Sequence, residues 1–145
     1  MVRIYTLTLA PSLDSATITP QIYPEGKLRC TSGGATGEHL VALLADENVP
    51  VSTVEAKDWT RQNLHVHVES SGEQYRFVMP GAALTDDEFY QLQDQVLEIE
   101  SGALLVISGS LPPGVQLEKL TRLITTAQKQ GIRCIVDSSG EALAA

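Results

Sequence analysis

The stretch ALLVISGSLPPGVQLEKLTRLITTAQKQGIRCIV, residues 103–136, contains two short apolar runs separated by an amphipathic segment. The first run, 103–108, is apolar up to its final serine, as in a strand that is covered on both faces. The segment between the runs has apolar residues at helical spacing, namely Leu117, Leu120, Ile124 and Ala127. Gly131 is placed to end this helix, and 132–136 forms the second run. The stretch therefore predicts a strand, a helix and a parallel strand in one sheet.

Two segments upstream fit the same layered arrangement. TDDE, residues 85–88, is a capping box in which Thr85 accepts a hydrogen bond at a helix start and Glu88 bonds back. Apolar residues follow at helical spacing, so this helix is expected to lie on a core: Phe89, Leu92, Val96 and Ile99. Residues 2–9, VRIYTLTL, are rich in β-branched side chains and predict a strand. These patterns indicate the α/β class with a parallel sheet.

The middle of the chain has a different pattern. Residues 63–69 alternate, with apolar and polar side chains on opposite faces of a strand: Leu64, Val66 and Val68 against His65, His67 and Glu69. An SSGE turn then leads into 74–79, which predicts an antiparallel hairpin. Residues 16–22 and 27–30 are two further short strand candidates. Strand pairs with one polar face suit a flap or lid better than a central sheet.

A helix and one more strand are expected between these segments. Thr36 is placed to cap a helix that ends before Pro50, and the apolar residues of this helix share one face: Leu40, Val41, Leu43 and Leu44. Residues 51–57, VSTVEAK, predict a strand. The chain is thus expected to divide into lid strands and an α/β body, with the lid near 16–31 and 61–79 and the body at 2–9, 33–57 and 84–145.

Composition and charge restrict the partners and the compartment. The 145 residues carry a net charge of -8, which argues against nucleic acid as a partner because phosphate backbones attract basic surfaces. The start of the chain is a poor signal peptide, and no window holds the roughly 18 apolar residues of a membrane helix. Cys30 and Cys134 lie far apart without metal-ligand spacing, so both are expected to be reduced thiols. We expect a soluble, cytoplasmic protein without a nucleic-acid or membrane partner.

Polar residues follow three of the predicted strands, where parallel sheets bind their ligands. The three loops are LAPSLDSA (9–16), SGSLPPG (108–114) and DSSGEAL (137–143). Asp14 is suited to accept hydrogen bonds from two neighbouring hydroxyls of a polyol, and Ser108 and Ser110 are suited to donate to oxygen. The alternative is that these loops are simple connections, which favour glycine, serine and proline in any case.

Two isolated cations and a histidine pair are further candidates. Arg61 and Lys27 stand alone in an acidic chain, and a guanidinium suits a phosphate group. Taken by itself, each is more readily interpreted as an ordinary solvated charge. His65, His67 and Glu69 resemble an H-x-H metal site, but a hydrated strand face is the favoured interpretation because no third protein ligand is evident.

Seven segments together resemble the PfkB/ribokinase family of sugar kinases: LAPSLDSA, YPEGKLRC, GGATGEHL, DWTRQNLHVHVE, QYRFVMPG, ISGSLPPGV and GIRCIVDSSGEAL. The resemblance covers essentially the whole chain. It implies a partial ribokinase-like (Rossmann-like) α/β fold, with a small β-sheet lid that doubles as a dimer clasp. It also implies descent from an ATP- and magnesium-dependent 6-phosphofructokinase, which transfers the γ-phosphate to the 1-hydroxyl of fructose 6-phosphate.

Four positions match substrate-binding residues of that family. By this resemblance, Asp14 holds sugar hydroxyls, and Arg61 is a lid arginine that faces the substrate phosphate. Ser110 lies in the sugar-phosphate pocket, and Lys27 reaches from the lid towards a neighbouring subunit's site. On this interpretation, SGSLPPG is part of a substrate pocket and not only a connection.

Two departures from the family pattern concern catalysis. Only Thr31 and Ser32 stand between Cys30 and Gly33, where the family has a glycine-rich segment, a helix and a core strand. The sequence also has no N-x-x-E stretch for magnesium and no G-A-G-D loop with the catalytic base. We therefore expect a truncated, internally deleted kinase homologue that lacks the ATP site and is inactive. Two alternatives are a non-catalytic sugar-phosphate binder and a fragment that dimerises through its lid strands.

Overall fold

The computed structural model describes residues 2–19 and 36–138, and the chain divides into two compact units. The first unit comprises Met1–Pro11, Ser52–Asp58 and Gly81–Ala145, and the second comprises Ser12–Val51 and Trp59–Pro80. Each unit contains its own three-stranded sheet.

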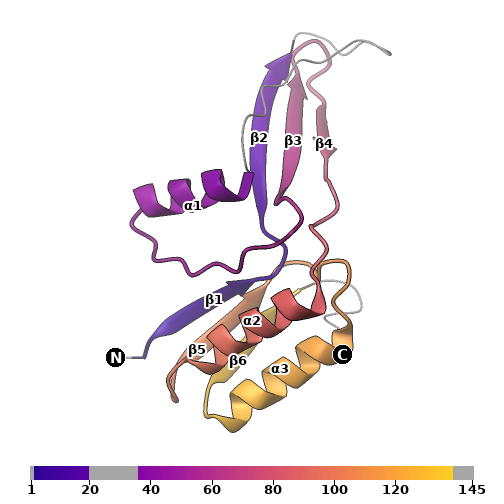
Figure 1. Cartoon of the computed structure of the whole chain (residues 1–145). Coiled ribbons are helices and arrows are strands. Elements are labelled where there is room, and N and C mark those ends of the chain that lie inside the picture. Colours follow the sequence, from indigo (N-terminus) through magenta and orange to yellow (C-terminus); the bar gives the residue numbers. More distant parts are fainter. Residues whose placement is uncertain (1, 20–35, 139–145) are drawn as a thin grey trace. The chain divides into compact units, whose positions relative to one another are not determined.

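The first unit is built on a parallel sheet in the order β1–β5–β6 (Figure 1). Its strands are β1 (Ile4–Thr8), β5 (Leu104–Ser108) and β6 (Arg133–Asp137), and its helices are α2 (Asp86–Leu97) and α3 (Leu117–Lys129). β5, α3 and β6 follow one another in the chain, and β5 pairs with β6 in parallel. The predicted strand–helix–strand unit and the α/β class are confirmed.

The core of this unit lies between its two helices and one face of the sheet. It contains apolar residues of β5, α2 and α3, among them Leu105, Ile107, Phe89 and Leu123. The opposite face is open, with Ile4 66% and Ile135 50% exposed, while Leu104 and Val106 are half-buried. The expectation that 103–108 is covered on both faces is therefore wrong within the described residues, because both helices pack on the same side.

α2 begins with the predicted capping box, and its glutamate makes an additional bond. Thr85 Oγ1 accepts from the Glu88 N–H at 3.3 Å, and Glu88 Oε2 accepts from the Thr85 N–H at 2.7 Å. Oε1 of Glu88 also accepts from the Lys57 N–H at 2.6 Å. This carboxylate therefore joins the segment Ser52–Asp58 to the start of α2. These two backbone donors lower the pKa of Glu88 against the opposing effect of burial.

Gly131 follows the C-cap of α3 and ends the helix, as predicted. The C-cap is Gln130, and Gly131 follows with a φ of 84°. The Ile132 N–H then bonds back to the Ala127 carbonyl at 3.1 Å, which satisfies a carbonyl in the last turn of the helix. Because glycine adopts positive φ without steric cost, this turn can reverse the chain directly into β6.

The second unit contains a sheet in the order β2–β3–β4 and one helix. Its strands are β2 (Ser12–Thr19), β3 (Arg61–Val68) and β4 (Gln74–Phe77), and its helix is α1 (Thr36–Asp46) (Figure 1). β2 and β3 pair in parallel, while β3 and β4 form the predicted antiparallel hairpin. Val66 and Val68 are buried and Leu64 is half-buried, so the predicted apolar face of β3 is confirmed.

The start of the second unit differs from the sequence-based expectation. β2 begins at Ser12, so Asp14 lies within a strand and not in a loop after β1. The strand candidate at 16–22 is found in β2 as far as the described residues reach, to Thr19, and Ser12–Ser15 extends it towards the N-terminus. The extension follows from pairing with β3, a partner more than forty residues away, and leaves no local pattern in the sequence. The other strand candidate of the predicted lid, 27–30, lies outside the described residues.

One further expectation for this region is wrong. Residues 51–57 form no strand. Most of this stretch belongs to the first unit, where the Thr53 carbonyl accepts from the Gln95 side chain at 3.4 Å. The helix α1 is found as predicted and ends before Pro50, but its apolar face is only partly covered: Leu40 and Leu44 are half-buried, while Val41 and Leu43 are exposed.

Candidate functional site

A group of polar side chains lies on one face of the β2–β3 pair, at the end where both strands begin. Ser12 is paired with Arg61, and Asp14 is paired with Asn63. Paired residues share a face of a sheet, and so do residues two apart along one strand. The four side chains therefore lie on the same face of the second unit.

Asp14 is held in this group by two side-chain donors. Asn63 Nδ2 donates to Asp14 Oδ1 at 2.8 Å, and Ser12 Oγ donates to the same oxygen at 3.2 Å. Asp14 itself is exposed. A carboxylate that is oriented by its neighbours and open to solvent is suited to accept hydrogen bonds from hydroxyl groups of a ligand.

Asn63 is a further residue of this group, which the sequence alone did not identify. It is buried, with only 7% of its surface exposed. Its Oδ1 accepts from the Met79 N–H at 3.1 Å, while its Nδ2 donates to Asp14. In the sequence Asn63 is only the first residue of an alternating strand. The signal that identifies it is its place opposite Asp14, which requires the register of two distant strands.

Arg61 lies two residues before Asn63, at the start of β3. It is half-buried, and its Nη1 donates to the Met79 carbonyl at 3.3 Å. The N–H and the carbonyl of Met79 are thus bound by two side chains of β3, Asn63 and Arg61. This arrangement holds a guanidinium on the same face as a carboxylate, which matches the polar and anionic parts of a phosphorylated polyol.

Ser110 lies in the first unit, in the connection that follows β5. The connection is held at three points: Gly109 N–H donates to the Asp137 carbonyl at 3.0 Å, Ser138 Oγ donates to the Gly109 carbonyl at 2.9 Å, and the Pro113 carbonyl accepts from Leu84 N–H at 3.0 Å. Ser110 itself is exposed. The connection therefore presents a hydroxyl from a restrained backbone at the carboxyl end of the sheet.

The four predicted site residues thus have different outcomes in the structure. Asp14 and Arg61 share one face of the β2–β3 sheet, and Ser110 belongs to the other compact unit. Lys27 lies outside the described residues. Their roles towards a substrate stay predictions.

Among residues 2–19 and 36–138, no group of three or more histidine, cysteine, aspartate or glutamate side chains is arranged to hold a metal. In the same part of the chain, no helix has both the length and the apolar character that a membrane crossing requires.

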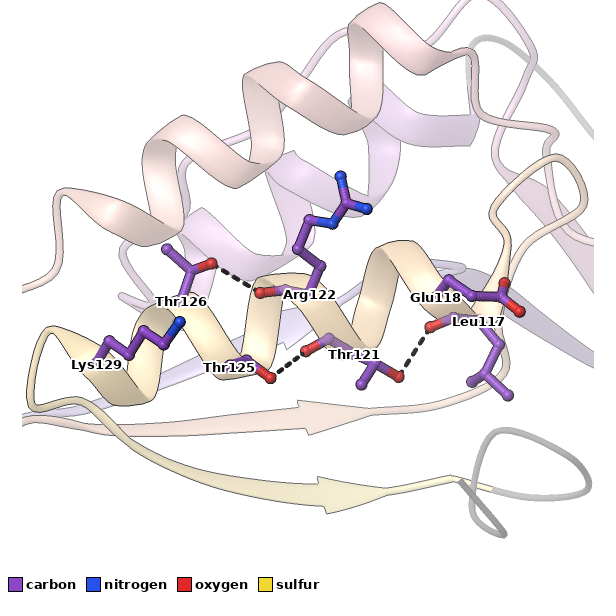
Figure 2. Close-up of a pocket in the computed structure, with 7 residues that line it drawn as sticks. All are labelled: Leu117, Glu118, Thr121, Arg122, Thr125, Thr126 and Lys129. Atoms are coloured by element: carbon purple, nitrogen blue, oxygen red, sulfur yellow. Dashed lines mark hydrogen bonds between the residues drawn. The ribbon is translucent and has the colours of Figure 1, made fainter.

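A shallow pocket lies along the outer side of α3 (Figure 2). Its lining residues all come from this helix: Leu117, Glu118, Thr121, Arg122, Thr125, Thr126 and Lys129. The three threonine hydroxyls donate to carbonyls one turn earlier, at 3.0, 2.8 and 2.8 Å. Because these hydroxyl protons are already used within the helix, the threonines can only accept further hydrogen bonds, and the remaining polar groups of the pocket are the charged side chains of Glu118, Arg122 and Lys129.

The family model and the relatives that match this chain indicate the same family. The model of the family described as "pfkB family carbohydrate kinase" matches residues 28–145. ATP-dependent 6-phosphofructokinase isozyme 2 of Escherichia coli (strain K12) is 75% identical over 174 aligned positions, covering 100% of this chain and 56% of that protein. The protein of the same description from Mycobacterium tuberculosis (strain H37Rv) is 33% identical, covering 97% of this chain and 50% of its own length.

Solved structures agree in fold. A crystal structure of phosphofructokinase-2 from Escherichia coli in complex with fructose-6-phosphate has a TM-score of 0.90 and 74% identity, covering 99% of this chain and 57% of that one. The chain thus spans about half the length of the relatives it matches. The 174 aligned positions also exceed the 145 residues of this chain, so the Escherichia coli protein contains an internal stretch without a counterpart here, as the resemblance implied.

Proposed function

Because the chain belongs to the pfkB family of carbohydrate kinases, we propose that its polar β2–β3 face binds fructose 6-phosphate. The observation that carries this proposal is the pairing of Asp14 with Asn63 beside Arg61 on one sheet face, in a chain 75% identical to an ATP-dependent 6-phosphofructokinase. A related phosphofructokinase-2 has been solved with fructose-6-phosphate, which supports the same ligand for this chain.

Each proposed residue has a distinct task. Asp14 accepts hydrogen bonds from sugar hydroxyls, and Arg61 supplies a planar cation for the phosphate. Ser110 donates its hydroxyl to the sugar phosphate, and Lys27 adds a second cation to a site of a neighbouring subunit. In a chain with a net charge of -8, such local cations are required, because the field of the whole molecule repels an anionic ligand.

We further propose that the 145 residues bind the sugar phosphate without phosphorylating it. In this family ATP is the phosphate donor, and magnesium typically assists. Phosphoryl transfer depends on positioning and electrostatic stabilisation of the transferred group, together with a group that orients or deprotonates the nucleophile. The sequence contains neither a G-A-G-D loop for this purpose nor an N-x-x-E stretch for magnesium.

Calorimetric titration of the purified 145-residue chain with fructose 6-phosphate tests the binding. We expect Arg61→Ala to raise the dissociation constant at least tenfold, on the order of the loss of one charged hydrogen bond. Arg133→Ala is the matched control, since it removes an exposed cation of β6 in the first unit and should leave the constant unchanged. Equal affinities for the parent and Arg61→Ala would contradict the assignment of Arg61.

A kinase assay tests the second part. With ATP, magnesium and fructose 6-phosphate, the chain should produce no fructose 1,6-bisphosphate above the level of a no-enzyme control. Turnover that survives repurification would overturn the proposed inactivity while leaving the binding proposal intact.

A second candidate function is association of two copies through the lid strands. β4 is an edge strand of the described sheet, and its apolar side chains are open: Tyr75 and Phe77 are each 42% exposed, and Val78 just after the strand is 64% exposed. Such an edge can pair with another strand, and a lysine on it opposes pairing. Light scattering should show a dimer that Phe77→Lys dissociates and Ser71→Lys, in the β3–β4 turn, does not. A monomeric parent at high concentration would exclude this function.

A further inference from the structure

Asn63 connects the proposed sugar-binding carboxylate to the backbone of the strand on its other side. Its Nδ2 donates to Asp14 Oδ1 in β2 at 2.8 Å, and its Oδ1 accepts from the Met79 N–H just beyond β4 at 3.1 Å. The side chain is only 7% exposed. A single buried amide in the central strand therefore bridges both neighbouring segments of the second unit.

The chemistry of the two partners fixes the orientation of this amide. If the amide were turned over, its oxygen would face the Asp14 carboxylate and its NH2 group would face the Met79 N–H. Both contacts would then be repulsive, so only the observed orientation satisfies all four groups. Met79 is itself restrained, because its carbonyl accepts from Arg61 Nη1 at 3.3 Å.

We propose that Asn63 is a positioning residue for Asp14 in sugar binding, an inference that rests on the proposed function of the β2–β3 face. Asp14 is exposed, so in the absence of a partner its side chain would sample several rotamers. The amide holds one carboxylate oxygen from within the protein and thereby directs the carboxylate before the ligand arrives. Such preorganisation strengthens binding because less side-chain entropy is lost on forming the complex.

The neighbouring residue provides a matched control. Gln62 lies next to Asn63 on β3, and its Nε2 donates to Ser15 Oγ of β2 at 2.7 Å. Both residues are amides of the same strand that bond to a side chain of the same neighbour, but Gln62 faces the opposite side of the sheet. A variant at Gln62 thus removes a β2–β3 side-chain bond without touching Asp14.

The first experiment is calorimetry on the full 145-residue chain with two probes, fructose 6-phosphate and inorganic phosphate. We expect Asn63→Leu to raise the dissociation constant for fructose 6-phosphate about tenfold, as for the loss of one hydrogen bond to a charged group. The constant for inorganic phosphate, which has no sugar hydroxyls for Asp14, should change less than about twofold. Gln62→Leu should leave both constants near those of the parent. A parallel loss of both ligands in Asn63→Leu, or equal effects of the two variants, would overturn the proposal.

A second variant covers the case in which the leucine is not tolerated. Asn63→Asp keeps an acceptor for the Met79 N–H but sets a second carboxylate against Asp14, and Arg61 and His65 flank the position on the same face. The two carboxylates repel each other, so the variant displaces the Asp14 carboxylate while keeping the acceptor for Met79. At a fixed pH of about 8, its dissociation constant for fructose 6-phosphate should exceed that of the parent about tenfold, while the constant for inorganic phosphate changes less than about twofold. An unchanged constant for fructose 6-phosphate would refute the positioning role.

The outcomes separate this inference from the proposed function. If Asp14→Ala weakens fructose 6-phosphate binding but Asn63→Leu does not, the site is correct and the role of Asn63 is wrong. If the parent binds neither probe, the proposed function fails, and the inference fails with it. The bond itself is then tested without ligand by nuclear magnetic resonance, since Asp14→Ala should shift the side-chain amide signals of Asn63 and leave those of Gln62 in place.

Discussion

The Glu88 carboxylate offers the sharpest test of how the first unit is held together. It accepts the Thr85 N–H at 2.7 Å and the Lys57 N–H at 2.6 Å, and it is 8% exposed. Loss of a helix cap costs about 1 kcal/mol, and a buried N–H left without its acceptor costs about 1 kcal/mol or more. We therefore expect Glu88→Gln, which keeps one acceptor and turns an NH2 group towards the other N–H, to lower the free energy of unfolding by about 2 kcal/mol at neutral pH.

The same residue predicts a pH dependence with a definite sign. The backbone donors lower the pKa of Glu88 in the folded chain below its usual value of about 4.3. A carboxyl group with a lowered folded-state pKa contributes stability above its unfolded pKa and loses it as the pH falls through the folded pKa. The difference in the free energy of unfolding between the parent and Glu88→Gln should therefore be largest near pH 7 and become smaller below about pH 4.

Urea denaturation, followed by circular dichroism near pH 7 and again below about pH 4, measures these differences in the free energy of unfolding. Asp87→Asn is the control, because Asp87 lies in the same first turn of α2 and is exposed. Removing its charge weakens only the interaction with the helix dipole, by about 0.5 kcal/mol. Equal losses for the two variants at pH 7, or an undiminished loss for Glu88→Gln at low pH, would refute the reasoning.

Two other substitutions and one labelling experiment test the same account. Gly114 has a φ of 88°, and a Cβ there would lie 2.6 Å from the Leu84 carbonyl oxygen, so Gly114→Ala should destabilise the fold by more than about 2 kcal/mol in urea denaturation. Gly72 has a φ of 72° with no atom near its would-be Cβ, so Gly72→Ala should cost only about 1 kcal/mol, and equal costs would count against the clash. Burial raises the pKa of Cys134, so in a Cys30→Ser background its thiol should react with iodoacetamide more slowly at pH 8 in the folded chain than in urea; equal rates would contradict this.

The parts of the fold that could be predicted from sequence are those with a local cause. The Thr85 capping box and the turn at Gly131 each depend on a few consecutive residues, and both are found as predicted. The burial of Val66 and Val68 follows from a two-residue alternation. In contrast, the apolar run of β5 says that a strand is buried but not how many of its faces are covered.

The parts that could not be predicted depend on partners far away in the chain. Nothing within LAPSLDSA indicates a strand, because Ser12–Ser15 extends the predicted strand only through pairing with Arg61–Leu64. The candidate site has the same character. Asp14 and Arg61 were recognisable as chemical groups, but Asn63 gains its meaning only from the register that places it opposite Asp14.

On the proposed function, sugar-phosphate binding and phosphoryl transfer are separate properties, and the register of β2 and β3 gives the physical reason. The orientation of Asp14 depends on Asn63, and the orientation of Asn63 depends on the Met79 backbone, so this network lies within the second unit. A β2–β3–β4 sheet that keeps its pairing keeps the network, whatever the first unit contributes. Phosphoryl transfer has no such local basis, because it needs a nucleotide, a metal and a base to be aligned with the bound sugar at the same time.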